Sequence, residues 1–251
     1  MGIEPVAIDL FKPETFERLH QVKRMVVSAA PPRGTPANYD KLFGQAIPRF
    51  MTYVATHRPP EKLIYTSSTA VYNLTNGQDV DESTPVSPAS PKTKALLASE
   101  NSVLGSGIPS IVYRLGGIYG HERNRLERLE PAAPAGPEDK GFINLIRVED
   151  AAASVLHLFR HGKAGDVYVG VDTRPVDRGE LNAWIRQQMG WPASLSRKKT
   201  PRKTGRFFQN KRCSSVKLIS TGYRFLYPTF EQGYGDIVHT ALAKSQKATK
   251  N

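Results

Sequence analysis

The sequence predicts an α/β protein with a doubly wound, mainly parallel sheet, and three observations support this fold class. Short apolar runs alternate with stretches in which apolar residues recur every three or four positions. The run KLIYTSS at 62–68 is apolar at its centre and ends in hydroxyl residues, which is typical of a strand buried on both faces. Prolines, glycines and polar clusters separate the segments. Strands that alternate with helices in this way form a parallel sheet with helices on both faces.

Each expected element has its own local signal. The segment 39–54 carries apolar residues three or four apart, which predicts a core-facing helix that Pro48 should kink or restart. Ser90 followed by Pro91 predicts a helix start, and a glycine at 105 or 107 should end that helix. We expect strands at 6–10, 25–30, 63–68, 108–115, 142–148 and 167–171. We expect helices beginning at 13 and spanning 39–54, 91–105, 151–160, 179–189, 214–220 and 230–242.

The chain of 251 residues is long enough for one sizeable core with a small appended lobe. We expect residues 1–175 to form a Rossmann-like core, in which 121–141 is a loop over the site and part of the substrate lobe. We expect residues 176–251 to form a small C-terminal α+β lobe that contains a basic loop at 192–212.

The expected compartment follows from what the sequence does not contain. The single cysteine, Cys213, excludes an intrachain disulfide and is compatible with a reducing environment. No run is long and apolar enough to span a bilayer, and no signal-peptide pattern opens the sequence. We therefore expect a cytoplasmic protein, or one in an organelle matrix or stroma.

The net charge of +12 comes largely from clusters of lysine and arginine, above all in the segment 197–212. Such clusters bind nucleic acid, phosphate-bearing ligands or anionic surfaces. A solvated loop is the alternative, because the only aromatic residues within the cluster are Phe207 and Phe208 and no nucleic-acid motif accompanies them. The segment 197–212 therefore stands as a candidate contact for an anionic partner.

Hydroxyl side chains follow the expected strand at 63–68. In open α/β sheets, ligands bind beyond the carboxyl ends of the strands, which places Ser67, Ser68 and Thr69 where chemistry would occur. The alternative is that these hydroxyls cap loose backbone groups. No G-x-S-x-G motif surrounds them, which argues against a hydrolase nucleophile. The six histidines have neither metal-binding spacing nor cysteine neighbours, and we expect no metal site.

The order of these motifs resembles the extended short-chain dehydrogenase/reductase superfamily, in an atypical branch of its NAD(P)-dependent epimerases and dehydratases. The segment TSSTAVY at 66–72 is similar to the family's strand with the active-site Ser or Thr, which falls on Ser68. YRLGGIYG at 113–120 is similar to the strand that reaches the nicotinamide end. NLIRVEDAA at 144–152 is similar to the late strand-to-helix signature. The resemblance covers nearly the whole chain.

The resemblance implies a cofactor, a substrate class and a set of site residues. The cofactor is NAD or NADP, and the substrate is a phosphate-bearing small molecule such as a nucleotide sugar. The implied catalytic residues are Ser68, Lys92 and Tyr119. The implied cofactor-binding residues are Asp9, Leu10, Ala29, Ala30, Ser67 and Leu115. The implied substrate-binding residues are Thr69, Arg114, Gly117, Asn144 and Arg147. Arg114 and Arg147 could equally be structural arginines that tie strand ends to the loop over 121–140. A homodimer is compatible with this assignment.

The sequence departs from the family pattern at two places. No glycine-rich phosphate-binding turn precedes Asp9, so that we expect a slot beside the strand at 25–30 or another element that fills it. At the positions of the family's Tyr-x-x-x-Lys pair, the helix has Lys92 and Leu96. Leucine cannot tune the proton affinity of a neighbour, and a solvated first-turn lysine is the alternative account of Lys92. Tyr72 or Tyr119 could supply a phenol instead, although packing at strand ends explains both.

Two functions remain open at this point. The first is an epimerase/dehydratase-like oxidoreductase, impaired in catalysis or weak in cofactor binding. The second is a non-catalytic Rossmann-like protein that binds a ligand, or an anionic partner through the segment 197–212. The missing turn and the Lys92/Leu96 pair favour the second, whereas the order of motifs favours the first.

Overall fold

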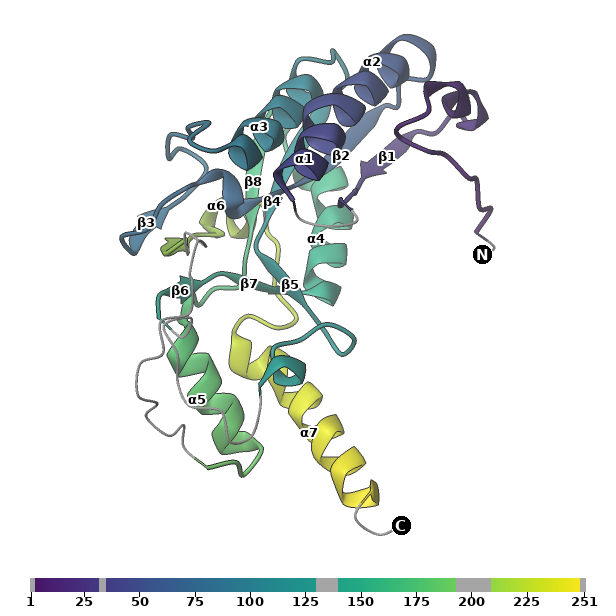
Figure 1. Cartoon of the computed structure of the whole chain (residues 1–251). Helices are drawn as coiled ribbons and strands as arrows, with labels where there is room; N and C mark the ends of the chain where they lie inside the picture. The colour runs from purple at the N-terminus through teal and green to yellow at the C-terminus, as the bar shows by residue number, and fades with distance from the viewer. Residues whose placement is uncertain (1–2, 32–34, 130–139, 193–208, 249–251) are drawn as a thin grey trace. The chain divides into compact units, whose positions relative to one another are not determined.

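The structure is a computed structural model that describes residues 3–31, 35–129, 140–192 and 209–248. The chain separates into two compact units (Figure 1). The first unit comprises residues 1–73, 84–114 and 155–168, and the second comprises residues 74–83, 115–154 and 169–251. The segment 115–154, which precedes the domain boundary expected at 175, thus clusters with the C-terminal residues. Most of the basic loop 192–212 lies outside the described residues.

A four-stranded parallel sheet with the order β1-β2-β4-β8 organises the fold, as the fold class predicted (Figure 1). Its strands are β1 (Arg24–Val27), β2 (Lys62–Ser68), β4 (Ser110–Leu115) and β8 (Val167–Gly170). β1 pairs with β2 in parallel, in a register that sets Met25 beside Leu63 and Val27 beside Tyr65. The β2 residues Leu63, Ile64 and Tyr65 are fully buried, which explains the unbroken apolar run that the sequence shows there.

The described part of the first unit contains the following helices. They are the 3₁₀-helix η1 (Pro13–Arg18), α1 (Pro36–Tyr39), η2 (Asp40–Ala46), α2 (Ile47–His57), the 3₁₀-helix η3 (Thr69–Val71) and α3 (Pro91–Leu104). The Ser90 hydroxyl accepts the backbone N–H of Thr93, and Pro91 occupies the first turn, so the predicted start of α3 is confirmed.

Pro48 restarts the helix at 36–57 by way of a π-helical turn. η2 is π-helical, and the backbone N–H of Ile47 bonds back to the carbonyl of Leu42. In an α-helix the Pro48 ring would clash with the carbonyl of residue 44, and the wider turn relieves that clash. The restart that the sequence predicted at Pro48 is therefore present as a π-helical turn. The chain nevertheless stays helical from residue 36 to residue 57.

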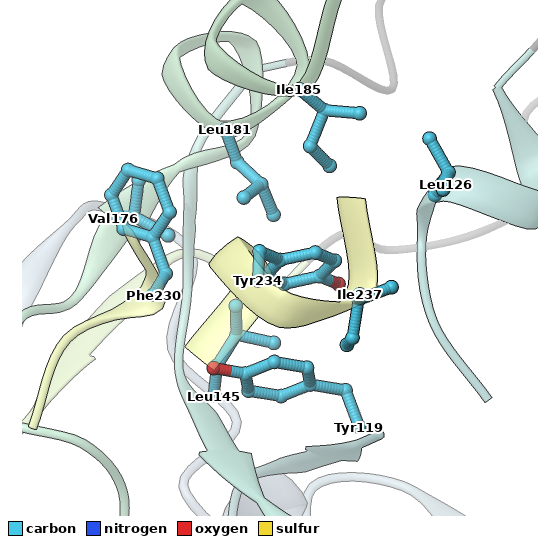
Figure 2. Packing of buried hydrophobic residues seen from close by; sticks show 9 residues of the cluster. All are labelled: Tyr119, Leu126, Leu145, Val176, Leu181, Ile185, Phe230, Tyr234 and Ile237. Atoms are coloured by element: carbon cyan, nitrogen blue, oxygen red, sulfur yellow. The ribbon is translucent and has the colours of Figure 1, made fainter. Parts of the chain in front are cut away.

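The described residues of the second unit form three two-stranded pairs and several helices. β5 (Gly117–Tyr119) and β7 (Leu145–Arg147) pair in parallel, as do β3 (Gln78–Val80) and β10 (Lys211–Cys213). β6 (Phe142–Ile143) and β9 (Val176–Asp177) pair antiparallel. The helices are η4 (Leu126–Arg128), α5 (Arg178–Gln188), α6 (Val216–Ser220) and α7 (Phe230–Ala248), while α4 (Val148–His161) is shared by both units. Figure 2 shows the apolar core of this unit, in which Tyr119 of β5 stacks on Tyr234 of α7.

Two predicted strands differ in the structure. Residues 6–10 form no strand, because Asp9 closes a turn instead: its carboxylate accepts the N–H of Phe11, and its own N–H donates to the hydroxyl of Thr15. The run 142–148 is divided into β6 and β7 at Asn144, and its last residue, Val148, begins α4. A single apolar run thus serves two different strand partners.

Candidate functional site

The carboxyl ends of β1 and β2 present small and hydroxyl side chains in the first unit. β1 runs into Ser28, Ala29 and Ala30, of which Ala29 is half-buried and Ala30 is exposed. β2 ends in Ser67 and Ser68. Because the two strands are parallel neighbours, these ends lie at the same edge of the sheet, where α/β proteins bind ligands.

Adjacent serines at the end of β2 have different partners. Ser67 is buried, and its hydroxyl donates to the Glu100 carboxylate over 2.5 Å. Ser68 is half-buried, and its hydroxyl accepts the N–H of Ala70 at 3.1 Å, as the cap of η3. An accepting hydroxyl keeps its hydrogen for another acceptor. Since side chains alternate along a strand, Ser68 and not Ser67 is the serine placed to meet a ligand.

A buried ion pair lies behind Ser67. Arg114 of β4 binds both carboxylate oxygens of Glu100 of α3, with an Nη2–Oε2 distance of 2.8 Å, and its Nη1 donates to the Tyr72 hydroxyl at 2.8 Å. Burial lowers the pKa of the Arg114 guanidinium, but the bonds from Glu100 and Tyr72 outweigh burial and raise it. This network fixes β2, α3 and β4 to one another, and its removal would leave a buried charge without a partner.

This network accounts for two residues expected in ligand contacts. Arg114, expected to bind substrate, is 5% exposed and its guanidinium is engaged by Glu100 and Tyr72. Tyr72, a candidate phenol, is 1% exposed. Both residues stabilise the packing around the end of β2 that carries Ser68. Neither side chain is exposed to solvent.

Lys92 and Leu96 occupy very different environments on α3. Lys92 is exposed, and its ammonium group lies 4.5 Å from the centre of the Tyr39 ring, a cation–π contact between the first turn of α3 and α1. Leu96 is 2% exposed and packs in the core. The two side chains therefore do not form the acid/base pair that the related helix position carries in the family the sequence resembles.

The remaining residues expected in the first unit lie as follows. Asp9 and Leu10 are half-buried in the turn that precedes η1, and not at a strand end. Thr69 is 8% exposed at the start of η3, where its carbonyl accepts the N–H of Tyr72. Thr69 thus shapes the turn that presents Ser68, whereas Asp9 is held by its own turn.

The site residues expected in the second unit form two groups, and Gly117 and Asn144 form the first. The N–H of Gly117 donates to the Asn144 carbonyl at 2.7 Å. The Asn144 side chain accepts the N–H of Cys213 and donates to the carbonyl of Lys211, so that it joins β10 to the break between β6 and β7. Leu115 is 6% exposed at the end of β4. Asn144 is thus a structural link between three strands.

Arg147 is the centre of the second group. It is 1% exposed and binds the carboxylates of Glu149 at 2.8 Å and Asp236 at 2.9 Å, as well as the carbonyl of Gly233. These carboxylate bonds outweigh burial and raise the pKa of the Arg147 guanidinium. His121, just after β5, contacts the same Asp236 at 3.0 Å. Arg147 therefore links β7 to α7. All three guanidinium nitrogens of Arg147 donate to protein groups among the described residues.

Tyr119 is the second candidate for a replacement phenol, and it is also buried. It is 3% exposed, stacks on Tyr234 at 4.6 Å between ring centres, and its hydroxyl has no hydrogen-bond partner among the described residues (Figure 2). Burial, followed by the nearby Asp172 carboxyl, raises the pKa of the Tyr119 phenol. A buried phenol whose pKa is raised is a poor proton donor or acceptor at neutral pH.

Sequence reasoning missed the contacts of three carboxylates, two of which bind these arginines. Glu100, Asp150 and Asp236 lie in or before helices as ordinary acidic residues, and only the fold shows what they bind. Asp150 is fully buried and accepts the Tyr223 hydroxyl and the backbone N–H groups of Leu226 and Tyr227, all within 2.8 Å. The sequence signal for Asp150 was its position in the strand-to-helix signature at 144–152. The resemblance associates that signature with the substrate lobe.

The described residues contain neither a metal-type cluster nor a helix suited to cross a membrane. No cluster of three or more histidine, cysteine or acidic side chains there has the geometry of a metal site. In the same residues, no helix combines the length and the apolar character that crossing a membrane requires.

Comparisons with known proteins identify the fold. No protein-family model matches the chain, and no curated protein matches it either. Solved structures match over most of its length. A functionally unknown conserved protein from Silicibacter pomeroyi is 25% identical, with a TM-score of 0.70 over 87% of this chain and 78% of that one. DesIV, a dTDP-glucose 4,6-dehydratase from Streptomyces venezuelae solved with NAD and DAU bound, is 17% identical, with a TM-score of 0.78 over 92% of this chain and 77% of that one.

A third structure supports the same assignment. RMD from Pseudomonas aeruginosa, solved in complex with NADPH, is 17% identical, with a TM-score of 0.76 over 96% of this chain and 90% of that one. The chain therefore has the Rossmann-like α/β fold of the NAD-dependent epimerases and dehydratases and of other short-chain dehydrogenase/reductase structures. The resemblance that the sequence motifs carried is confirmed at the level of the fold.

The described residues fit a dinucleotide only in part. The small side chains of Ala29 and Ala30 and the half-buried hydroxyl of Ser68 offer room and a hydrogen-bond donor at this edge of the sheet. Residues 1–23 contain no glycine-rich turn, the feature that lets a backbone approach a pyrophosphate closely.

Proposed function

We propose that this protein is an epimerase/dehydratase-like, NAD(P)-binding protein of the oxidoreductase type whose proton-transfer step is impaired. Its ligand is a nicotinamide dinucleotide at the carboxyl ends of β1 and β2, together with a phosphate-bearing substrate. The fold supports the ligand class, because the matched structures include proteins solved with NAD or NADPH. A fold by itself does not imply turnover, and the site carries the rest of the argument.

One observation carries the proposal: Ser68 lies half-buried at the carboxyl end of β2, while Lys92 and Leu96 are engaged elsewhere. Ser68 is placed to hydrogen-bond a reacting oxygen. Lys92 is held over the Tyr39 ring, and Leu96 is in the core. A ligand at this edge would therefore find a hydroxyl to bind but no tuned phenol to exchange a proton with. Binding with weak or no catalysis is what this combination supports.

Thermal unfolding with added nucleotide tests the proposal. We expect NADPH or NADH to raise the Tm of the full chain, since a ligand at ~100 times its Kd stabilises the native state by about 2.7 kcal/mol. For a chain of this size, that gain corresponds to a rise in Tm of several degrees. We expect oxidoreductase turnover to be slow or absent in the same preparations.

A matched pair of substitutions locates the ligand. Ala30→Trp fills the edge beside β1 at an exposed position, and we expect it to remove the nucleotide-dependent rise in Tm. Thr56→Trp lies in the last turn of α2, which leads into the amino end of β2, and we expect it to keep that rise. If neither nucleotide raises the Tm of the full chain, the proposed function is wrong. If Ala30→Trp still responds, the ligand binds elsewhere.

A further inference from the structure

Asn76 is the one asparagine of residues 1–251 that is followed by glycine. Asparagine is among the thermolabile residues of proteins, because the backbone nitrogen of the next residue can attack the carbon of its side-chain amide. A side chain on that next residue hinders the approach, and glycine has none. The pair Asn76-Gly77 therefore combines the two residue types that react with each other most readily.

The structure leaves this pair open to the reaction. Asn76 is exposed in the bend before β3, and its side-chain amide makes no hydrogen bond to a described residue. Gly77 has a φ of +78°, which L side chains rarely adopt, so that the turn itself requires glycine here. The Gly77 N–H donates to the carbonyl of Asn210 at 2.8 Å. A single hydrogen bond beside an exposed residue opens at low cost, which frees the nitrogen to attack.

Asn210 joins the turn at 74–77 to the rest of its unit. Its N–H donates to the Leu74 carbonyl at 2.8 Å, while its own carbonyl accepts the N–H of Gly77. Its side-chain oxygen accepts the N–H of Phe142, the first residue of β6, at 2.9 Å. The pairing of β3 with β10 begins one residue further along each segment. The bond between Gly77 and Asn210 is thus the first contact of the β3–β10 pair.

We propose that Asn76 deamidates spontaneously and that the isoaspartate formed there releases β10 from β3. In the first step the Gly77 nitrogen bonds to Cγ of Asn76, the bond from Cγ to Nδ2 breaks, and ammonia leaves with the hydrogen of the Gly77 amide. Water then opens the succinimide ring at the main-chain carbonyl of residue 76. Its oxygen enters the new carboxylate, one hydrogen returns to the Gly77 nitrogen, and the backbone continues through Cγ.

The isoaspartate lengthens the backbone by one carbon atom directly before Gly77. An insertion into one of two paired segments displaces the donors and acceptors that follow it, as a bulge does. The Leu74 carbonyl and the Gly77 N–H then no longer meet Asn210 together. Because β10 has only three residues, the loss of its first contact removes much of its pairing with β3. We therefore expect β10 to open more often in the modified chain.

Cys213, the last residue of β10, reports this opening. It is the single cysteine of the sequence and is 2% exposed. Burial raises the pKa of the Cys213 thiol to about 11. Since the thiolate is the reactive form, the folded chain should react slowly with a thiol reagent. Opening of β10 exposes the thiol and should accelerate that reaction.

Ageing of the full chain in mildly alkaline buffer tests the chemical step. Peptide mapping by mass spectrometry follows the conversion at Asn76, and methylation by an isoaspartyl methyltransferase detects the isoaspartate. We expect conversion in the folded chain to be no more than ~10-fold slower than in urea, since one hydrogen bond restrains the Gly77 nitrogen. Asn73, which is exposed but followed by leucine, is the internal reference and should convert at least ~10-fold more slowly than Asn76.

The rate at which Cys213 reacts with an aromatic disulfide reagent tests the release of β10. We expect the converted chain to react at least ~10-fold faster than the fresh chain. Asn76→Gln, whose longer side chain closes the ring far less readily, should keep the slow rate after ageing. Asn73→Gln is the matched control and should gain reactivity as the unsubstituted chain does. Fresh Asn76→Asp adds the charge without the extra backbone carbon and should react slowly.

Each outcome supports the proposal or contradicts it. A folded chain that keeps Asn76 while the chain in urea converts would overturn the chemical step. A converted chain whose Cys213 reacts no faster than before would overturn the release of β10, and so would fresh Asn76→Asp that reacts as fast as the converted chain. If Asn76→Gln failed to fold by circular dichroism, conversion of the unsubstituted chain against Asn73 would decide. The inference concerns the second unit and does not rest on nucleotide binding in the first.

Discussion

At the scale of single residues, Asp172 lies in an environment that differs strongly from the ordinary one of an aspartate. It is 1% exposed; one carboxyl oxygen accepts the N–H of Arg174 at 3.2 Å, and the other has no hydrogen-bond partner among the described residues. The Arg174 guanidinium is shared with Glu180 and Glu231, and Asp150 adds a second buried carboxylate nearby. Burial therefore raises the pKa of the Asp172 carboxyl to about 8.

This shift predicts that stability falls with rising pH. Asp172 keeps its proton in the folded state up to about pH 8, whereas the unfolded chain loses it near its ordinary value of 3.8. Between these two pH values the folded state binds more protons, and the free energy of unfolding decreases as pH rises. We expect Asp172→Asn to remove this decrease, which is about 3 kcal/mol between pH 5 and pH 7.5. Urea unfolding of both proteins at these pH values measures the difference, and equal slopes would show that Asp172 is not the cause.

At the scale of elements, the Lys62 side chain caps the C-terminal end of α4. Its ammonium group donates to the carbonyls of Leu158, Phe159 and Gly162 at 3.1, 3.2 and 2.6 Å. Carbonyls in the last turn of a helix have no partner within it, and a cation there also favours the helix dipole. Burial, followed by the Arg24 charge, lowers the pKa of the Lys62 ammonium group. The first residue of β2 therefore fixes the end of a helix that follows it by almost 100 positions.

Loss of this cap should loosen α4 locally. Lys62→Met keeps the apolar stem and removes three hydrogen bonds, and we expect a destabilisation of about 1–3 kcal/mol. Amide hydrogen exchange should accelerate in the last turn of α4 more than in α2. Lys23→Met is the matched control, because the Lys23 side chain is 85% exposed and pairs only with the exposed Glu61. Equal effects of the two substitutions would mean that the cap has no special weight.

At the scale of the whole molecule, charge is the dominant feature. The formal net charge of +12 favours association with polyanions, and the excess lies mainly in 197–212 and the C-terminal lysines. Residues 193–208 lie outside the described residues, and the contact of 197–212 with an anionic partner remains a prediction from sequence.

Heparin chromatography tests that prediction. We expect the chain to be retained and to elute earlier as salt rises, because binding through several cationic side chains releases counterions. Replacing Arg197, Lys198 and Lys199 with alanine should lower the salt concentration needed for elution. A triple replacement of other basic residues, Lys12, Lys23 and Lys41, removes the same charge and is the matched control. If both triple variants elute together, net charge and not this segment determines retention.

The sequence determined those features that depend on neighbouring residues. The alternation of strands and helices, the capped start of α3 and the hydroxyl residues at the end of β2 follow from periodicity, caps and strand-end composition. Ser68 was singled out among these hydroxyl residues by the resemblance of the segment 66–72 to the family's active-site strand. The turn at Asp9 was missed because the apolar run before it predicted a strand. In the structure the backbone of Asp9 bonds instead to the hydroxyl of Thr15, six residues away.

Only the tertiary structure decided what the long side chains do. Arg114 and Arg147 looked like ligand-binding arginines, and the fold brings them to Glu100 and Asp236 across 14 and 89 positions of sequence. A buried guanidinium must find a carboxylate, and which carboxylate it finds depends on the packing of helices that periodicity places but does not orient. Local pattern thus fixes elements and their edges, whereas the pairing of buried charges belongs to the assembled core.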